Sequence, residues 1–459
     1  MNRRQFLSLA ALAAAPRFAA AKERKLKIAP ARQSLVGADH PDTAVWTYNG
    51  AVPGPELRFR QGERLRIEVE NALGVDTTVH WHGVRVPNAM DGVPVLTQPP
   101  ITANGGRFTY EYVLRDAGTY WYHPHLGSPE QVGRGLYGPL IVDEAEPPAL
   151  DRDVTWMLGD WRLDRHAQVI EDFGNFMDAS HAGRIGNTVT VNGAIRETFE
   201  LRAGERVRLR LVNAANARIF ALDFRDHEPL VIALDGQPVE PHRPANGRVV
   251  LGPSMRADIL LDAVGEPGRA YQVVDDFYPR RAYRLLDLRY EKSRMRGKAG
   301  ASLPKLAPNP LSEPDLAKAE RHRVEFGGGM MGNMPGGMGM GGMMGGAHRM
   351  AWTVNGRPMP DNGHAHEPIL KLGLGRSYVL ELVNDTQWHH PIHLHGHVFR
   401  VITRDGKPAR RREWLDTVLL DPRTRAEIAF VADNPGNWML HCHILEHQAS
   451  GMMAVVRVA

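Results

Sequence analysis

The sequence predicts an all-β protein built from three consecutive β-sandwich domains. Three observations support this fold class: a sequence pattern that occurs three times, short runs in which apolar and polar residues alternate, and no convincing long amphipathic helix. The run 65–70, Leu-Arg-Ile-Glu-Val-Glu, has the period of two that is typical of a strand with one buried face. A length of 459 residues also accommodates about three domains of ordinary size.

The repeated pattern contains an Asn-Gly pair, then a glycine, and then an asparagine. The glycine precedes the final asparagine by nine residues in every copy: Gly62 and Asn71, Gly204 and Asn213, and Gly375 and Asn384. Chance is a poor explanation for that agreement, so we expect three copies of one folded unit. The expected domains are 22–147, 148–292 and 350–459, and 293–349 is expected to be a linker.

The composition narrows the kinds of site that the chain can hold. It has 21 His and 18 Met but only one cysteine, Cys442, which excludes an intramolecular disulfide and any all-cysteine zinc or iron–sulfur site. Imidazole, thioether and a single thiolate are ligands that point towards copper. The formal charge of +4 falls by three, to +1, without Arg3, Arg4 and Arg17 of the N-terminal segment. A nearly neutral chain has no general electrostatic attraction for nucleic acid, which we exclude as a partner.

Residues 1–21 have the pattern of an export signal. The pair Arg3-Arg4 precedes a short apolar stretch, and Ala19–Ala21 offers a small-residue cleavage site. This pattern predicts a twin-arginine signal peptide, the twin-arginine export machinery as a partner, and a periplasmic location. No stretch approaches the roughly 18 apolar residues of a membrane helix. We therefore expect a monomer that is exported and is not an integral membrane protein.

Four His-x-His pairs occupy matching positions in the first and third repeats. One pair follows the repeat asparagine by nine residues, and another follows a later glycine by five. The eight histidines are His80, His82, His123 and His125 in the first repeat, and His393, His395, His441 and His443 in the third. Residues two apart on a strand point to the same face, so each pair can present both imidazoles to one site. The matching offsets predict one metal cluster that both outer domains face.

Cys442 lies inside the last of these pairs, so its thiol must point to the opposite face of the strand and to a different site. By the same parity, His390 faces the side of Cys442, and His447 and Met452 follow at intervals of five residues. Two His, one Cys and a weak axial Met form the blue-copper ligand set. Met453 is the adjacent alternative to Met452. Four other histidines have no comparable support and are expected at the surface or behind the ligands: His364, His366, His389 and His397.

Together the four motifs resemble those of the three-domain multicopper oxidases, of the bacterial laccase-like or periplasmic cuprous oxidase type. The resemblance extends over essentially the whole chain after residue 21 and implies cupredoxin-like Greek-key sandwiches that bind four copper ions. It assigns His390, Cys442, His447 and Met452 to the type 1 copper, and His80 and His393 to the type 2 copper. It assigns His82, His123 and His443 to one type 3 copper, and His125, His395 and His441 to the other.

The resemblance also implies a reaction, in which single electrons enter at the type 1 copper and dioxygen is reduced to water at the trinuclear cluster. Cys442 and its neighbours His441 and His443 would connect the two sites, and these three residues are candidate catalytic residues. Asp91, in the loop after the first histidine pair, resembles the family's proton-relay acid; the alternative is an ordinary turn aspartate before a glycine. Many bacterial relatives have a second acid after the last type 1 histidine, where this chain has Gln448.

Residues 327–346 contain 11 Gly and 7 Met, a composition that cannot build a packed core. Thioethers select Cu(I), so we interpret the segment as a collector of cuprous ions, similar to an insert of periplasmic cuprous oxidases; the alternative is a linker with incidental Met. Those relatives place an Asp and a Met before the HxxHxH motif, where this chain has Thr386 and Trp388, so their substrate-copper site does not carry over residue by residue. The expected donors are Cu(I), with a role in copper tolerance, or phenols and aromatic amines in a laccase without that role. A non-catalytic copper-binding protein is the alternative outside the oxidases.

Overall fold

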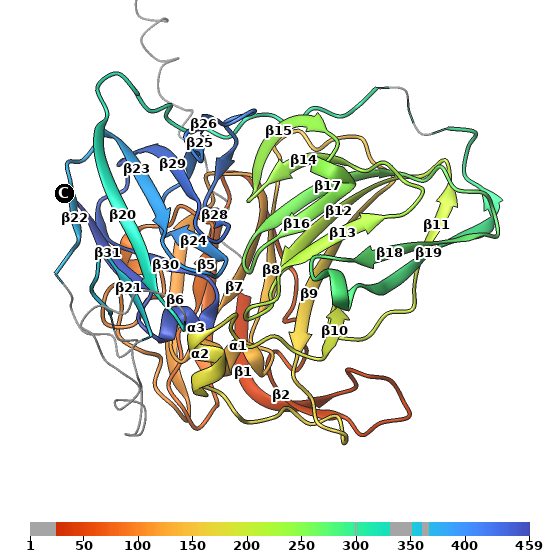
Figure 1. The fold of residues 1–459 in the computed structure, drawn as a ribbon. Helices are drawn as coiled ribbons and strands as arrows, with labels where there is room; N and C mark the ends of the chain where they lie inside the picture. Colours follow the sequence, from red (N-terminus) through yellow and green to blue (C-terminus); the bar gives the residue numbers. More distant parts are fainter. Residues whose placement is uncertain (1–23, 299, 301, 331–350, 360–366) are drawn as a thin grey trace, which may run out of the picture.

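The structure, a computed structural model, describes residues 24–298, 300, 302–330, 351–359 and 367–459. In this part of the chain six β-sheets pair into three sandwich domains, and the helices are short (Figure 1). The predicted all-β class is therefore confirmed. The predicted signal peptide 1–21, residues 331–346 of the Met- and Gly-rich segment, and His364 and His366 lie outside the described residues.

The first domain consists of two four-stranded sheets. One has the order β2-β1-β4-β6, with β1 (Arg24–Gln33), β2 (Thr43–Tyr48), β4 (Arg64–Asn71) and β6 (Gly106–Val113). The other has the order β3-β8-β7-β5, with β3 (Leu57–Arg60), β5 (His80–His82), β7 (Gly118–His123) and β8 (Gly138–Asp143). Apolar and charged residues alternate along β4: Leu65, Ile67 and Val69 lie in the core, and the charged residues between them are half-buried.

The second domain contains a six-stranded and a five-stranded sheet. The larger has the order β10-β9-β12-β17-β14-β15, with β9 (Arg152–Trp161), β10 (Thr188–Val191), β12 (Arg206–Asn213), β14 (Leu230–Leu234), β15 (Gln237–His242) and β17 (Arg256–Asp262). The smaller has the order β11-β19-β18-β13-β16, with β11 (Thr198–Ala203), β13 (Phe220–Phe224), β16 (Arg248–Leu251), β18 (Ala270–Asp275) and β19 (Tyr283–Arg294). Unlike β4, strand β12 is buried on both faces, because Arg208 and Arg210 form ion pairs with Asp258 and Arg210 also donates to Thr119 of the first domain.

The third domain contains a seven-stranded and a five-stranded sheet. The larger has the order β21-β20-β23-β29-β25-β26, with β27 paired to β25; its strands are β20 (Glu320–Gly328), β21 (Trp352–Val354), β23 (Ser377–Asn384), β25 (Phe399–Arg404), β26 (Lys407–Pro408), β27 (Trp414–Leu415) and β29 (Arg425–Val431). The smaller has the order β22-β31-β30-β24-β28, with β22 (Leu370–Leu372), β24 (His390–Leu394), β28 (Thr417–Leu420), β30 (Gly436–Cys442) and β31 (Met453–Val458). Both histidine motifs predicted for this domain begin in the smaller sheet and continue into the residues directly after β24 and β30.

The asparagine of each repeat has the same structural role in all three domains. Asn71, Asn213 and Asn384 end β4, β12 and β23, and each is buried. Each side-chain amide donates to backbone carbonyls of two different segments of the chain, and each side-chain oxygen accepts the backbone N–H two residues further on. A buried amide that satisfies its own donors and acceptor in this way fixes the loop after the strand. In the outer domains that loop leads to the first histidine pair.

The structure differs from the predicted linker 293–349 in two places. Strand β19 continues to Arg294, and β20 (Glu320–Gly328) lies well inside the predicted linker. β20 pairs with β23 in parallel, as β1 pairs with β4 and β9 with β12. The third domain therefore begins before residue 350, and the Gly-rich run starts as the end of a strand.

In the described part of the chain six short helices connect the strands: α1 (Ser128–Gly133), α2 (Phe176–Ser180), α3 (Leu445–Ala449), η1 (Asn88–Met90), η2 (Ala245–Gly247) and η3 (Pro279–Arg281). Among the described residues, none of the helices has the length and apolar character needed to cross a membrane. α3 packs against both α1 and α2, and the three helices, from three different domains, lie together in the lower part of the view in Figure 1.

Candidate functional site

Strand pairing brings the eight predicted cluster histidines together. β5 pairs with β7 so that His80 lies opposite His123, and β24 pairs with β30 so that His393 lies opposite His441. The two half-sites then meet across the boundary between the first and third domains. The rings of His80 and His395 stack at 4.1 Å between centroids, and those of His82 and His393 at 3.9 Å.

Within this cluster, ring nitrogens approach one another in small sets, each with its atoms within 4.8 Å. The sets are His80, His82 and His123; His80, His393 and His395; and His125, His395 and His441. The ring of His443 lies 4.9 Å from that of His82 and 5.1 Å from that of His123. The structure thus places all eight predicted histidines in one buried group, and it brings His125, His395 and His441 together as the resemblance assigns them.

The donor set of this group fits metal ions. Burial, reinforced by neighbouring imidazoles, lowers the pKa of His82, His123, His125, His395, His441 and His443 well below the ordinary value, so these rings are neutral. Several buried ring nitrogens have no hydrogen-bond partner: Nε2 of His80, His123 and His393, Nδ1 of His82, and both nitrogens of His125 and His443. Neutral imidazoles with free lone pairs that converge on one volume are what copper requires.

Hydrogen bonds behind the cluster orient the rings. His80 Nδ1 donates to the Asp91 carbonyl at 2.7 Å, and His441 Nδ1 donates to the Cys442 carbonyl at 2.9 Å. His395 Nδ1 donates to the Asp91 carboxylate at 2.9 Å. Since the Nδ1 hydrogens of His395 and His441 are used in this way, their Nε2 atoms, 3.0 Å apart, both present lone pairs, and a cation between them would relieve the repulsion.

Cys442 and two histidines form a second, separate group. Cys442 Sγ lies 3.4 Å from His390 Nδ1 and 3.7 Å from His447 Nδ1, and the three residues are fully buried. Their other ring nitrogens are engaged: His390 Nε2 donates to Thr386 Oγ1 at 2.8 Å, and His447 Nε2 donates to the His181 carbonyl at 2.6 Å. Burial raises the pKa of the Cys442 thiol, so a thiolate here needs a cation beside it. This set also fits copper.

Met452 and Met453 lie on opposite sides of the chain. The carbonyl of Met452 accepts the Cys442 N–H at 3.0 Å, and its side chain is buried in the same apolar cluster as Cys442. Met453 pairs with His441 in the register of β30 and β31 and packs against Val93 and Met439. Met452 is therefore the methionine on the side of the Cys442 group.

Asp91 is fully buried and belongs to the cluster. It follows η1, its carboxylate accepts from His395, and its carbonyl accepts from His80. Gly92, the next residue, has φ +84°, and a Cβ there would lie 1.9 Å from the Val79 carbonyl oxygen. The sharp turn at Gly92 thus lets the loop return close to β5 and aims Asp91 inward.

Sequence reasoning missed three charged residues behind the cluster: Asp416, Arg256 and Asp235. Asp416 Oδ1 accepts from His82 Nε2 at 3.3 Å, and its carbonyl accepts from His393 Nδ1 at 2.8 Å. Burial opposes ionisation of Asp416, but Arg256 outweighs it and holds the pKa below the ordinary value. Arg256 and Asp235 come from the second domain, which has no histidine pair, so nothing in the repeat pointed to them.

Gln448 and Glu446 on α3 are both buried. Glu446 turns to the second domain, where its carboxylate accepts from the Arg184 N–H and from Asn216 Nδ2, each at 3.0 Å. The side-chain amide of Gln448 has no hydrogen-bond partner among the described residues. The structure thus places an amide, and no acid, directly after His447.

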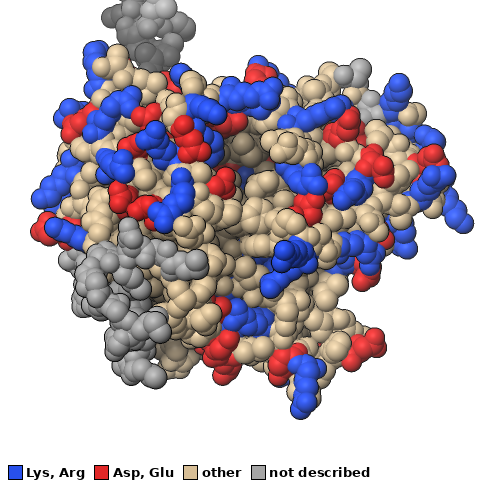
Figure 2. Space-filling model, viewed as in Figure 1, with Lys and Arg blue, Asp and Glu red and all other residues tan. Residues whose placement is uncertain are grey.

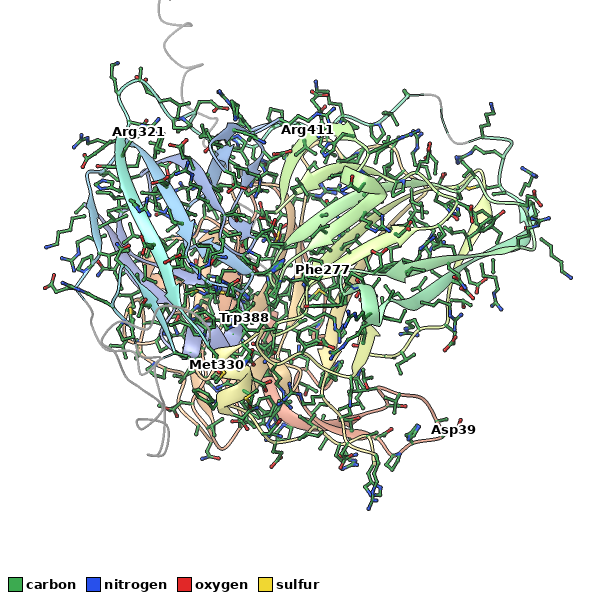
Figure 3. The ribbon with its side chains drawn as sticks, viewed as in Figure 1. Asp39, Phe277, Arg321, Met330, Trp388 and Arg411 are labelled. Carbon is green, nitrogen blue, oxygen red and sulfur yellow. The ribbon has the colours of Figure 1, made fainter. Side chains whose placement is uncertain are left out.

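A second-domain segment covers the Cys442 group. The carbonyl that accepts from His447 belongs to His181, directly after α2, and the His181 ring lies 5.3 Å from that of Trp388. Met330 donates its N–H to the Ser180 carbonyl at 2.9 Å, and its own carbonyl accepts from Trp388 Nε1. Met330 and Trp388 accordingly lie close together in Figure 3. The Met-rich segment therefore begins next to the cover of the Cys442 group.

Comparisons with known proteins agree with this arrangement. Three family models, each described as multicopper oxidase, match residues 31–147, 152–286 and 339–459. The chain is 32% identical to a multicopper oxidase of Mycobacterium tuberculosis over 92% of this chain and 84% of that protein. It is 37% identical to the crystal structure of a multicopper oxidase from Pseudomonas thermotolerans, with a TM-score of 0.85, over 96% of this chain and all of the other. Copper resistance protein A of Escherichia coli is 26% identical, over 90% and 89% of the two chains.

Proposed function

Because this chain belongs to the multicopper oxidase family and is an oxidoreductase that uses O₂, we propose that it oxidises one-electron donors beside Cys442 and reduces dioxygen to water at the histidine cluster. Four bound copper ions, one at Cys442 and three in the cluster, would supply the redox chemistry. The observation that carries the proposal is the direct covalent connection between the two groups. Cys442 belongs to one group, while His441 and His443 on either side of it belong to the other.

The chain's own residues divide the remaining tasks. The neutral imidazoles would hold the cations, and the hydrogen bonds of Asp91 and Asp416 keep the rings oriented. Water formation consumes protons, and Asp91 is suited to pass them because its carboxylate contacts a cluster histidine directly. The apolar core around Cys442 excludes water from the thiolate.

Cu(I) is the first donor that we propose, and copper tolerance the corresponding role. Met330 lies against the cover of His447, and the six further Met of the Met-rich segment follow it in the sequence. Thioethers bind Cu(I) selectively, so this segment would deliver cuprous ions close to the electron-accepting site. The similarity to copper resistance protein A supports the same role. Phenols and aromatic amines are the second donor class.

The decisive experiment combines three measurements on the copper-loaded protein without residues 1–21. We expect about four copper ions per chain, an intense thiolate–copper absorption band, and oxygen consumption with Cu(I) and with a phenol. Copper binding without oxygen consumption would show that the protein binds copper but is not an oxidase. Oxidation of the phenol but not of Cu(I) would show that the protein is a laccase and has no role in copper tolerance.

We also propose that residues 1–21 direct twin-arginine export to the periplasm. The paired arginines and the alanines before residue 22 support this. Replacing both arginines, Arg3→Lys and Arg4→Lys, should retain the protein in the cytoplasm, as measured by fractionation. Unchanged periplasmic accumulation would contradict the proposal.

A further inference from the structure

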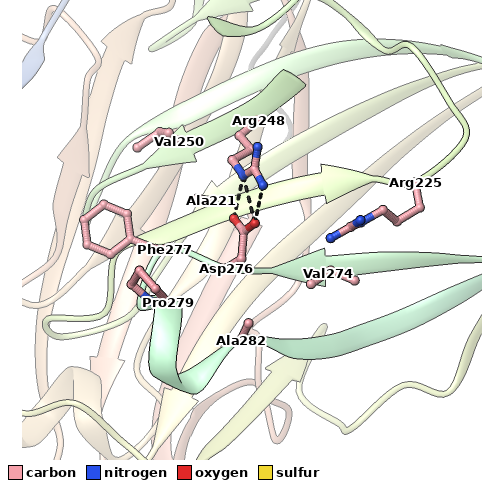
Figure 4. Close-up of a pocket in the computed structure, with 9 residues that line it drawn as sticks. All are labelled: Ala221, Arg225, Arg248, Val250, Val274, Asp276, Phe277, Pro279 and Ala282. Carbon is pink, nitrogen blue, oxygen red and sulfur yellow. Dashed lines mark hydrogen bonds and ion pairs between the residues drawn. The ribbon is translucent and has the colours of Figure 1, made fainter. Parts of the chain in front are cut away.

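The second domain has a surface cavity of about 550 Å³ that none of the copper-ligand motifs lines. Strands β13, β16 and β18 and the segment η3 surround it (Figure 4). Its apolar lining includes Val250, Val274 and Phe277, and Val250 is 42% exposed although it is a large apolar residue. Apolar walls with a few polar groups are typical of small-molecule sites.

The charged groups at this cavity are mainly basic. Arg248 and Arg225 line it; Arg248 is held by Asp276 through bonds of 2.5–2.8 Å, and Arg225 pairs with Asp223 at 2.9 Å. Two further arginines, at positions 280 and 281, follow the lining residue Pro279 in η3. The lining itself holds two arginines and one aspartate, a net charge of +1, and Figure 2 shows basic side chains with acidic ones among them over this part of the surface. Such a cavity favours an anion and disfavours a cation such as Cu(I).

The inner wall of the cavity borders the strand that begins with His390. The Phe277 ring lies 5.3 Å from the ring of His389, the residue before His390. Strand β16, which contributes Val250, leads to Gly252, where a Cβ would lie 3.3 Å from Cβ of Pro391, the residue after His390. The cavity therefore adjoins His390 through Phe277 and His389, and the strand that contributes Val250 runs on towards Pro391.

We propose that this cavity binds aromatic electron donors that carry a carboxylate, such as hydroxybenzoates. The donor ring would pack against Phe277, and its carboxylate would meet the guanidinium groups of Arg225 and Arg248. This inference rests on the proposed function. The phenolic O–H then loses one electron and one proton and becomes a phenoxyl radical. The electron would pass by way of Phe277 and His389 to the type 1 copper that His390 would hold, and the proton goes to water. Four such oxidations supply the electrons for one O₂.

Aromatic acids and Cu(I) therefore enter at different places. The acids use the basic cavity on β13, β16 and β18, whereas Cu(I) arrives at the segment of Met330 and His181. In Figure 3, Trp388 lies between Phe277 and Met330. This separation allows one donor class to be disabled without the other.

Binding of a probe that cannot be oxidised at its phenol, 3,4-dimethoxybenzoate, tests the cavity without catalysis. Arg225→Gln should raise its Kd about two- to fivefold, the range for one exposed charge pair. Asp276→Asn should lower the Kd by a similar factor of about two to five, since Arg248 loses its competing carboxylate. Arg269→Gln is the matched control, because Arg269 pairs with Glu266 elsewhere on this domain. An unchanged Kd in Arg225→Gln and Asp276→Asn would overturn the proposal.

Steady-state kinetics of a matched donor pair provides the second test. Arg225→Gln should raise KM for 4-hydroxy-3-methoxybenzoate by about two- to fivefold and leave that of neutral 2-methoxyphenol unchanged. Phe277→Leu should lower kcat for the acid while Cu(I) oxidation continues at the wild-type rate. Equal changes for the acid and the neutral phenol would overturn the cavity assignment. Absence of oxygen consumption with every donor would instead refute the proposed function, and the binding measurements would still decide whether the cavity binds the acid.

Discussion

The guanidinium of Arg256 in the second domain holds the carboxylate of Asp416 in the third, with N–O distances of 2.9 and 2.5 Å, directly behind His82 and His393. Both residues are at most 1% exposed. Asp235 completes the group: its carboxylate accepts the backbone N–H groups of Arg256 and Thr417. The domain without copper ligands thus supplies the cation that balances the charge behind the cluster.

Arg256→Met should therefore destabilise the protein strongly. Removing the guanidinium leaves a buried carboxylate without its partner, which costs about 3–5 kcal/mol. Urea unfolding of the metal-free variant measures this cost, and copper analysis should show loss of ions held by His82 and His393. Arg269→Met, in an exposed pair with Glu266, should change the free energy of unfolding by less than about 1 kcal/mol. Equal free energies of unfolding for the two variants would show that the buried pair of Arg256 and Asp416 makes no net contribution to stability.

Asp91→Asn should slow the reduction of O₂ but leave the absorption of the Cys442 site intact. The amide keeps the size of the side chain but removes the acid that contacts His395. We expect reoxidation by O₂ in stopped-flow experiments to slow by about 10- to 100-fold. Asp39→Asn, in an exposed loop, is the control. Unchanged turnover in Asp91→Asn would remove Asp91 from the mechanism.

Thr386→Val should alter the Cys442 site alone. Thr386 Oγ1 accepts from His390 Nε2 and donates to Asn384 Oδ1, so valine removes the group that orients this imidazole and makes it more electron-donating. The reduction potential should rise by roughly 60 mV or less, a tenfold change in the one-electron equilibrium. Redox titration of the absorption band measures the shift. As a control, Thr198→Val, in β11, should leave the reduction potential at its wild-type value. A wild-type potential in Thr386→Val would contradict the role of Thr386 in orienting His390.

Deleting residues 331–346 should slow oxidation of Cu(I) while oxidation of a small dye persists or increases. The deletion begins after Met330 because β20 continues to Gly328 and Met330 bonds to Ser180. Oxygen consumption with each donor measures the effect. A Gly/Ser segment of equal length separates loss of thioethers from loss of length. If neither rate changes, the segment does not collect cuprous ions.

The metal-free protein should lose stability in acid partly through His227, which is far from the cluster in the second domain. Burial lowers the pKa of His227, and its Nε2 bonds to Tyr290 Oη at 2.6 Å. The unfolded chain binds a proton below its ordinary pKa of about 6.5, whereas the folded chain does not until a lower pH. Stability is therefore complete above about pH 6.5 and falls towards the lowered pKa, by up to about 1.4 kcal/mol per pH unit for this group. His227→Gln should show a smaller decrease in urea unfolding between pH 7 and 5; an identical slope would contradict this account.

Features of the site that follow from the residue spacing within one segment of the chain could be predicted from the sequence. Strand parity separated Cys442 from His441 and His443, and the repeat placed the histidines at equivalent positions of two domains. The role of Asn384 in fixing a loop explains why those offsets are constant. Strand β20 also had a readable signal, since Val324 and Phe326 are buried and the residues between and beside them are not, but the following glycines concealed it.

Contacts between domains had no such signal. The pairing of Arg256 with Asp416 and the cover of His447 by the His181 carbonyl join residues separated by 160 and 266 positions. Neither residue pair lies in a periodic pattern, because their positions follow from how whole domains pack. The cavity beside Phe277 could not be predicted from the sequence for the same reason.

The stacking of His80 on His395 and of His82 on His393 has a consequence for biosynthesis. Each half of the cluster is made at a different time, the first near residue 80 and the last at residue 443. A ribosome that has produced the first domain has produced only half of every shared metal site. Insertion of copper into this cluster would therefore have to wait until nearly the whole polypeptide has been synthesised, and a chain truncated before residue 441 would never mature into an oxidase.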